Sequence, residues 1–436
     1  MGHILEIKFF NTFILRSETT NTLYVEESRM KGGFNEDFVS IGPKAHLVDD
    51  TYAETRRENA LIYSGIYNSR TDINRTNVFS GGEKITRAVD PSNGAIQKLH
   101  AEDTNLNILQ EDKVSRALID KDALFTAEGG RLTASGAAVI GQVVPFTGKY
   151  GIQNPESFAV HGNRKYFVDK DRGVVLRLSS GIGGGNGLIE ISQFGMRDYF
   201  KDNLNLIDNS FDSSDKIVGG YDNHSDEYVV SLQNSNIESS NADQRLRGFQ
   251  TLNFDDSTNG WASFYTFKPD FIFSIDNKFY SLKNNNLWEH YKNTEYNKFY
   301  DNVIIDSQLI GGAFTSNITF IANTEPSTIK NFYTINYEGD DSWKMISSKT
   351  DTNIEAFPVL ENTNYSGSNV LGASFVEKEN KYYANLKDNT TGTLKNQVVG
   401  VNPAGIKGFF TTVEMQNGAN TKKELFAVSH IVSKSS

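Results

Sequence analysis

Apolar residues in this chain gather in short runs that alternate with polar stretches rich in Gly, Asn, Ser and Thr. The clearest hairpin covers residues 164–179, RKYFVDKDRGVVLRLS. Residues 166–168 form one apolar arm, residues 169–173 the turn, and residues 174–178 the return arm. Gly173 suits a positive φ at the end of that turn. Short apolar arms joined by polar turns predict β-strands.

Similar arm–turn–arm units recur along the chain. Their arms begin near Leu106, Tyr166, Tyr228 and Phe279, roughly 50 to 60 residues apart. A fixed period of this size is typical of a propeller or of another repeat architecture. A large irregular β-sandwich is the alternative interpretation.

Helical patterns are few. Residues 195–204, GMRDYFKDNL, place four apolar side chains on one helical face. These side chains are Met196, Tyr199, Phe200 and Leu204. A weaker helical pattern covers residues 112–118, although the same residues also fit a hairpin turn and its return arm.

From about Tyr337 onward, strands are expected between Asn/Gly/Thr-rich turns. They cover residues 343–348, 370–376, 381–386, 408–413 and 424–432. We therefore predict an all-β fold with a β-propeller-like repeat domain followed by a smaller β-sandwich. The expected domains are residues 1–55, an N-terminal arm or partial upstream β domain with a Gly32-Gly33 turn; 56–340, the propeller-like domain; and 341–436, the sandwich.

The composition agrees with this fold and narrows the chemistry. There are 29 Phe and 19 Tyr but 8 Pro and no Cys. Aromatic residues favour strands. The lack of cysteine excludes disulfides, thiolate metal sites and cysteine nucleophiles. It fits a protein that folds in a reducing cytoplasm.

The charge balance argues against general nucleic-acid affinity. The chain carries 54 acidic and 43 basic residues, a formal net charge of -11. Binding to phosphates needs a basic surface. No apolar run is long enough to predict a membrane span. The first residues are too polar for a signal peptide, and an apolar strand begins almost at once, which suggests part of a longer polypeptide.

Three motifs resemble binding loops. Asp169-x-Asp171-x-Gly173 begins like a calcium loop, but Ser180 replaces the required Glu, so a plain turn is predicted. The glycines of residues 181–187, GIGGGNG, lack a following Lys-Ser and a helix, which favours a hairpin tip. Residues 257–261, STNGW, resemble the structural Asp-box turn of sialidase-type propellers.

Histidines and carboxylates give no local catalytic pattern. The seven histidines form no H-x-H or H-x-x-x-H pair and are interpreted as packed or surface residues. They are His3, His46, His100, His161, His224, His290 and His430. Asp222, Asp226 and Glu227, like Glu111 and Asp112, are predicted to be solvated turn residues; a glycosidase pair is the alternative.

Aromatic residues concentrate in WASFYTFKPDFIF. They are Trp261, Phe264, Tyr265, Phe267, Phe271 and Phe273. Such density is interpreted as core or subunit interface, and a sugar-stacking platform is the alternative. We therefore predict no catalytic, cofactor-binding or metal-binding residues, no cofactor, and no enzymatic activity.

Several segments together resemble a family of large virion structural proteins of tailed phages. They are residues 103–129, 154–181, 187–204, 221–232, 260–290 and 323–339. The family includes proteins of marine T4-like phages and the tail muzzle proteins of crAss-like phages. It is more distantly similar to the propeller-bearing nozzle proteins of short-tailed phages. The likeness covers residues 55–340 and indicates the C-terminal portion of a longer family member.

The resemblance implies a structural component of the tail, neck or baseplate that docks into a symmetric ring. The implied partners are copies of itself and other tail or neck proteins, with DNA passing unbound and with contact to the host surface. The implied location is the virion, after assembly in the host cytoplasm. The alternative is a receptor-binding or glycan-cleaving tail protein.

Overall fold

The computed structural model describes residues 12–16, 23–27 and most of 57–434. Within the last range it leaves out residues 66, 80–84, 103–104, 126–130, 180–186, 211–212, 235–248, 293–294, 301–303, 306–307, 310–311, 362–372 and 390–404. The predicted Gly32-Gly33 turn and most of the predicted glycine-rich tip lie outside the described residues. The chain divides into two compact units, Met1–Phe264 with Lys268–Asn277, and Tyr265–Phe267 with Lys278–Ser436.

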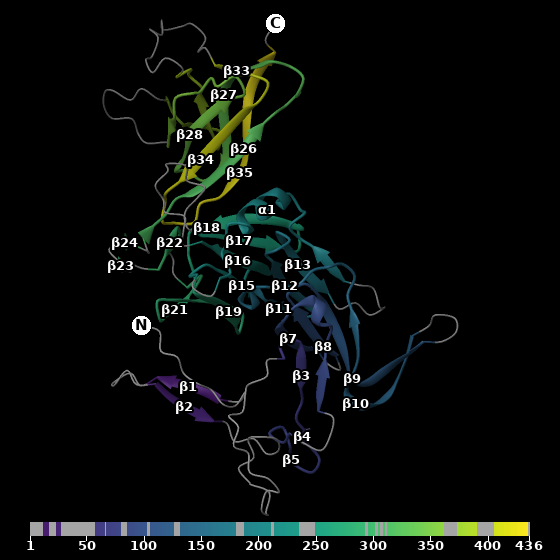
Figure 1. The fold of residues 1–436 in the computed structure, drawn as a ribbon. Coiled ribbons are helices and arrows are strands. Elements are labelled where there is room, and N and C mark those ends of the chain that lie inside the picture. The colour runs from purple at the N-terminus through teal and green to yellow at the C-terminus, as the bar shows by residue number, and fades with distance from the viewer. Residues whose placement is uncertain are drawn as a thin grey trace, which may run out of the picture. The chain divides into compact units, whose positions relative to one another are not determined.

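Three four-stranded sheets dominate the first unit, and in each the strands pair in chain order (Figure 1). The first sheet contains β7 (Ile96–Glu102), β8 (Asn105–Gln110), β9 (Val114–Phe125) and β10 (Arg131–Pro145). The second contains β11 (Ala159–His161), β12 (Arg164–Asp169), β13 (Val174–Ser179) and β14 (Leu188–Glu190). The third contains β15 (Lys216–Asp222), β16 (Glu227–Gln233), β17 (Phe249–Asp255) and β18 (Gly260–Tyr265).

This arrangement confirms the all-β prediction and corrects one part of it. Each sheet is a meander of the kind that the sequence period predicted. The sheets of the described residues are separate, however, and none of them closes into a ring, so the closed propeller is not found. A period marks the repeated meander, whereas ring closure depends on the angle between successive meanders, which no period specifies.

Smaller elements complete the first unit. Three two-stranded sheets are formed by β1 (Thr12–Arg16) with β2 (Leu23–Glu27), by β3 (Ala60–Ile62) with β6 (Thr86–Ala88), and by β4 (Tyr67–Asn68) with β5 (Ile73–Asn74). Two 3-10 helices cover Pro91–Asn93 and Pro155–Ser157, and β19 covers Phe271–Ile275. Gly220 of β15 leaves room for β19, because a Cβ there would lie 2.7 Å from the Ile272 side chain.

One helical prediction is confirmed and the other is wrong. Helix α1 (Arg197–Leu204) buries Phe200 and Leu204, with Met196 and Tyr199 packed against the same core. The residues predicted as a weaker helix instead begin β9, where Val114 pairs with Leu109. Val114 and its neighbours also fit a strand, and pairing with β8 decides between the two.

In three long turns of the first unit, an aspartate at the end of the strand holds the backbone of the turn. Asp169, Asp222 and Asp255 end their strands, and each carboxylate accepts a hydrogen bond from a backbone N–H of the turn that follows. The donors are Arg172 at 3.2 Å, His224 at 2.8 Å and Ser257 at 2.7 Å. The carboxylate thus replaces the strand pairing that the turn lacks.

The last residue of each of these turns has a positive φ. The angles are 67° at Gly173, 59° at Asp226 and 49° at Asn259. Gly and Asn or Asp tolerate this region best, which is why the turn can reverse the strand without strain. The positive φ predicted for Gly173 is confirmed, and Asn259 shows that the STNGW motif forms the turn between β17 and β18.

The second unit contains a β-sandwich. One five-stranded sheet has the order β26 (Ser316–Ala322), β34 (Thr411–Asn417), β28 (Trp343–Thr350), β29 (Val359–Leu360), β30 (Ala373–Ser374). In the other, β27 (Lys330–Gly339) pairs with β32 (Lys381–Asn385), β33 (Ile406–Gly408) and β35 (Leu425–Lys434), and β31 (Val376–Lys378) pairs with β32. Apolar residues of both sheets form one core that includes Phe332, Met345 and Met415.

Three strand pairs precede the sandwich in the second unit. They are β20 (Lys278–Lys283) with β21 (Asn286–Glu289), β22 (Lys298–Phe299) with β25 (Gly312–Ala313), and β23 (Ile304–Ile305) with β24 (Gln308–Leu309). The β20–β21 turn, Asn284 and Asn285, has φ of 49° and 63°, as a tight two-residue hairpin turn requires.

Most sandwich strands follow the predicted ranges. Two predicted single strands are each divided, the first into β30 and β31 and the second into β33 and β34. The sandwich also uses β26 and β27, which begin before residue 341. The two domain boundaries drawn from the sequence stay a prediction. In the described part of the chain, no helix is long and apolar enough to cross a membrane.

Candidate functional site

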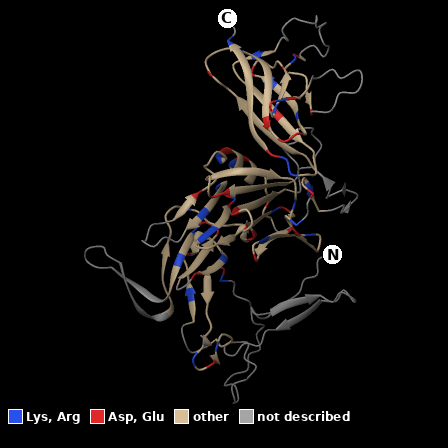
Figure 2. Ribbon diagram, turned by 180° about the vertical axis from the view of Figure 1, so that it is seen from behind, with Lys and Arg blue, Asp and Glu red and all other residues tan. Residues whose placement is uncertain are grey.

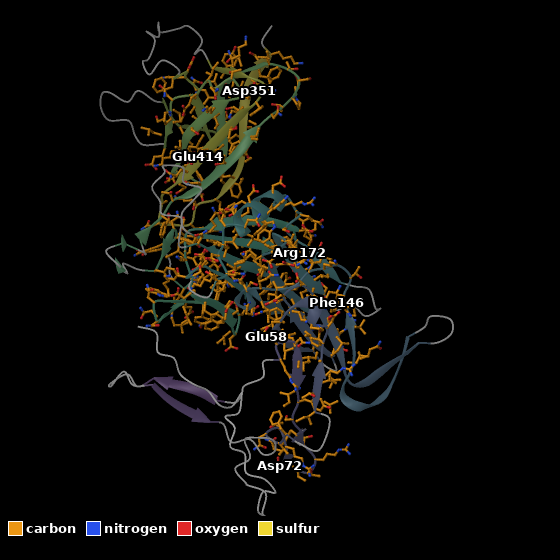
Figure 3. All side chains as sticks on the ribbon, in the orientation of Figure 1. Glu58, Asp72, Phe146, Arg172, Asp351 and Glu414 are labelled. Carbon is orange, nitrogen blue, oxygen red and sulfur yellow. The ribbon has the colours of Figure 1, made fainter. Side chains whose placement is uncertain are left out.

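Buried charged residues lie where neighbouring sheets of the first unit meet. The first of these joints centres on Asp169, whose side chain is fully buried. Its carboxylate accepts hydrogen bonds from the Gly151 N–H at 2.9 Å, from Gln153 Nε2 at 3.2 Å and from Arg172 Nη1 at 3.1 Å. Arg172, which is labelled in Figure 3, also donates to Asp112 Oδ1 at 3.0 Å and so ties the second sheet to the first.

The geometry of this joint shows that Asp169 is held by protein donors. Burial raises the pKa of Asp169, while the Gly151 N–H and the Arg172 guanidinium oppose that rise. Gly151 is needed because a Cβ would overlap the carbonyl group of Glu111. Asp169 therefore fixes the joint as well as the turn. Among the described residues, no group of three or more His, Asp or Glu is arranged to hold a metal ion.

A second contact between these sheets is a buried ion pair. The Lys165 side chain of β12 is 1% exposed, and its ammonium group pairs with the Glu102 carboxylate of β7. It also donates to the Asn163 carbonyl at 3.2 Å. A buried ammonium group is costly without such partners. The pair therefore specifies how the second sheet lies on the first.

The joint between the second and third sheets centres on Asp256, in the turn after β17. Its side chain is 8% exposed. The carboxylate accepts hydrogen bonds from Arg164 Nη1 at 2.7 Å, from the Arg177 guanidinium and from the Tyr166 hydroxyl, all on the second sheet. Burial favours a higher pKa for Asp256, but the hydrogen bonds from Tyr166 and Arg177 outweigh it and hold the pKa below its ordinary value.

Stacked aromatic rings accompany the Asp256 joint. Tyr166 stacks on Tyr228 with centroids 5.0 Å apart, and on Tyr221 at 5.5 Å. His161 stacks on the other side of Tyr221 at 4.1 Å. Burial, together with the nearby Asp256 charge, raises the pKa of Tyr221 to about 12. The three tyrosine rings stay neutral at physiological pH and supply the apolar part of the joint.

One hydroxyl–imidazole pair in the second unit has the geometry of a nucleophile and its base. Ser281 Oγ lies 2.8 Å from His290 Nε2, and the Tyr300 hydroxyl donates to Ser281 Oγ at 3.0 Å. Such pairs activate serine in hydrolases. Here Ser281 is fully buried, and the rings of Phe267 and Phe279 pack against His290. The pair is placed to fill a core. Sequence reasoning missed it because Ser281 lies on β20 and His290 directly follows β21, the strand that pairs with β20.

The carboxylates considered as a glycosidase pair are used by the fold. Asp222 is buried and accepts hydrogen bonds from the His224 N–H and the Ser225 hydroxyl, so the prediction of a solvated side chain is wrong for it. Glu227 accepts from Asn253 Nδ2 at 2.6 Å. Glu111 accepts from Gln97 Nε2 at 3.0 Å. The sequence did not reveal the contacts of Glu227 and Glu111, because their donors come from other strands, whereas the donors to Asp222 lie in the turn that follows it.

The aromatic run contributes to both core and surface. The Trp261 indole donates to the Ile191 carbonyl at 3.1 Å and packs on Phe200 with centroids 4.5 Å apart. Phe264 and Phe271 are exposed, at 58% and 45%. Histidines also pack: His161 as above, and His430 beside Phe332. His3 and His46 lie outside the described residues.

Basic and acidic side chains occur together on the described strands of both units (Figure 2). Fold and charged joints thus define an all-β protein of stacked meanders whose buried charges have protein partners. Two models of one family match the chain: "Crassvirus muzzle protein" over residues 86–285 and its C-terminal domain over residues 294–389. Together they span well over half of the 436 residues, and the chain belongs to the Crassvirus muzzle protein family. A comparison with curated proteins finds no match.

Proposed function

We propose that this protein is a non-enzymatic structural part of the phage tail or neck that works by docking with copies of itself and with other tail proteins. Membership of the muzzle family, which is a family of phage structural components, carries this proposal. The proposal is supported by the buried joints, in which Asp169, Asp256 and Lys165 serve the rigidity of the sheets. Permanent assemblies need such rigid faces, since they bury large areas.

The proposed place in the particle is tested by quantitative mass spectrometry of purified virions, followed by a particle reconstruction. We expect this chain in a fixed ratio to the other tail proteins, with density for the three meanders and the sandwich. Particles that are complete and infectious without a stoichiometric copy of this chain would contradict the proposal.

The non-enzymatic part is tested separately. Purified protein is incubated with polysaccharide from the bacterial host, and released reducing ends are measured. We expect none above the level of a heat-denatured sample. Turnover that disappears in a Ser281→Ala variant of unchanged stability would instead assign a hydrolytic role to the buried hydroxyl–imidazole pair.

A further inference from the structure

An amine, a carboxylate and a primary amide meet where the first two sheets pack together. Lys165 of β12 and Asn107 of β8 are each 1% exposed. The Glu102 carboxylate of β7 contacts both of them: Oε1 pairs with the Lys165 ammonium group, and Oε2 accepts a hydrogen bond from Asn107 Nδ2 at 3.2 Å. One carboxylate thus holds an amine on one oxygen and an amide on the other.

Strand register explains why these three side chains meet. Glu102 lies opposite Asn105 in the β7–β8 pair, and Asn107 lies two residues further along β8, so Glu102 and Asn107 project from the same face of the first sheet. On β12, Lys165 lies two residues before Phe167, whose ring packs in an apolar cluster shared with the first sheet. Lys165 therefore projects toward that face of the first sheet.

The three groups are buried in an unfavourable state. Among the described residues, Asn107 Oδ1 is buried and accepts no hydrogen bond. The ammonium and carboxylate charges also lose hydration here. Transfer of a proton from Lys165 to Glu102 leaves two neutral groups, which apolar surroundings favour. A neutral lysine amine is a nucleophile, and the carbonyl carbon of the Asn107 amide is an electrophile beside it.

We propose that Lys165 and Asn107 form an isopeptide bond in the folded protein. Glu102 takes a proton from the Lys165 ammonium group, and the lone pair of the amine forms a bond to Cγ of Asn107. Glu102 gives that proton to Nδ2, the bond between Cγ and Nδ2 breaks with its electron pair, and ammonia leaves. The new amide nitrogen then passes its extra proton to Glu102. Nothing is oxidised or reduced, so the reaction needs no further reactant.

The fold supplies what this reaction requires. Holding both reacting groups against one carboxylate gives the effective concentration that amide exchange in solution lacks. The product joins β8 to β12 covalently, in a chain that has no cysteine for a disulfide. It restricts the unfolded chain as a disulfide does. This inference goes beyond the proposed docking function and does not rest on it.

The intact mass of the folded full chain tests the bond. Loss of one ammonia lowers the mass by about 17 Da relative to the sequence. Trypsin should leave residues 99–113 joined to residues 165–170, because it does not cleave after a modified lysine. Fragmentation of that pair locates the link at Asn107 and excludes a succinimide at an Asn-Gly step, which has the same mass. A folded wild-type chain with the mass of its sequence would overturn the proposal.

Two asparagine variants separate the chemistry from packing. Asn107→Leu keeps the side-chain volume and the Lys165–Glu102 ion pair but has no amide to attack, so the mass should return to that of the sequence. Asn105→Leu is the matched control, because Asn105 lies on the same face of β8 and opposite Glu102. It should keep the cross-link. A cross-link in Asn107→Leu, or its loss in both variants, contradicts the assignment. If Asn107→Leu does not fold, the wild-type peptide map decides.

Glu102→Gln tests the role of the carboxylate. Glutamine cannot take the Lys165 proton, so formation of the cross-link should slow by at least about a hundredfold. The rate is measured by the mass of chains sampled over time after cell-free synthesis, counting only folded chains that resist limited proteolysis. A folded variant that cross-links at the wild-type rate would remove Glu102 from the reaction. Virion mass spectrometry is independent of these results, so the proposed function can stand while the bond is absent.

Discussion

The two units of the chain solve the packing of β-sheets in different ways. In the first unit, apolar clusters span neighbouring sheets and buried ion pairs accompany them: Asp169 with Arg172, Lys165 with Glu102, and Asp256 with two arginines. In the second, the sandwich core consists of apolar residues such as Phe332, Met345 and Met415. A core of this kind tolerates approximate packing, whereas a charged joint accepts few alternative geometries.

The difference suggests that the arrangement of sheets needs more specification in the first unit than in the sandwich. Buried ion pairs contribute little net stability but can specify one arrangement, because any other leaves a charge without a partner. Three stacked meanders need such specification, since similar meanders could otherwise pack in several registers. The sandwich needs less of it, because its two sheets share one apolar core.

The largest expected effect comes from removing the centre of a charged joint. Asp256→Ala leaves two guanidinium groups and the Tyr166 hydroxyl without their acceptor. Breaking a buried ion pair in this way costs about 3 to 5 kcal/mol. Urea unfolding followed by regional hydrogen exchange should show this loss in the first unit and leave the sandwich unchanged.

Asp171→Ala is the control for that experiment, because Asp171 is exposed in the corresponding turn of the second sheet. It should change the unfolding free energy by less than about 0.5 kcal/mol. Equal losses of unfolding free energy in the two variants would show that the Asp256 joint does not hold the sheets together. The proposed difference between the two units would then be wrong.

The sandwich should instead respond to pH through one partly buried histidine, His430. Burial lowers the pKa of His430 to about 4, from an ordinary value near 6.5. The unfolded chain therefore takes up the proton first as pH falls. The stability that neutral His430 supports is complete above pH 6.5 and is lost as the pH falls toward 4. The loss amounts to about 2 to 3 kcal/mol.

The measurement is the unfolding free energy of the sandwich between pH 7 and pH 4, in the wild type and in His430→Leu. The difference between the two should change over this window, because carboxylates titrate in both proteins and cancel. A pH profile of identical shape in the variant would show that His430 does not set the acid sensitivity of the sandwich.

The sequence was informative wherever a feature is local. Residues 164–179 carry alternating arms and a turn ending at Gly173, and they form the β12–β13 hairpin. The face of Phe200 and Leu204 likewise specifies α1. Residues 112–118 were misassigned because the same apolar spacing fits a helix and a strand, and pairing between β8 and β9 lies outside that window.

The joints could not be predicted, because their members are distant in sequence. Tyr166 and Asp256 are 90 residues apart, and Asp112 and Arg172 are 60 apart. Nothing in either local pattern links the partners. The Ser281–His290 pair was missed for a related reason: its nine-residue spacing is no motif, and the two side chains meet because β20 and β21 pair. Closure of the sheets into a ring depends on the angles between successive sheets, and the spacing of the sequence repeats does not specify these angles.

The smallest expected effect on stability comes from substituting an asparagine with positive φ in a tight turn. It should be the same in both units, because the backbone conformation of such a turn depends on the turn residues alone. Asn259 in the first unit and Asn380 in the second have φ of 49° and 61°. Glycine adopts this region more readily than Asn, so Asn259→Gly and Asn380→Gly should each stabilise their unit, or leave it unchanged, within about 0.5 kcal/mol. The alanine variants at the same positions should each cost about 1 kcal/mol. Thermal unfolding of the four variants measures these changes in stability. If Asn380→Ala lost several times more unfolding free energy than Asn259→Ala, the two units would differ in their turns as well as in their joints.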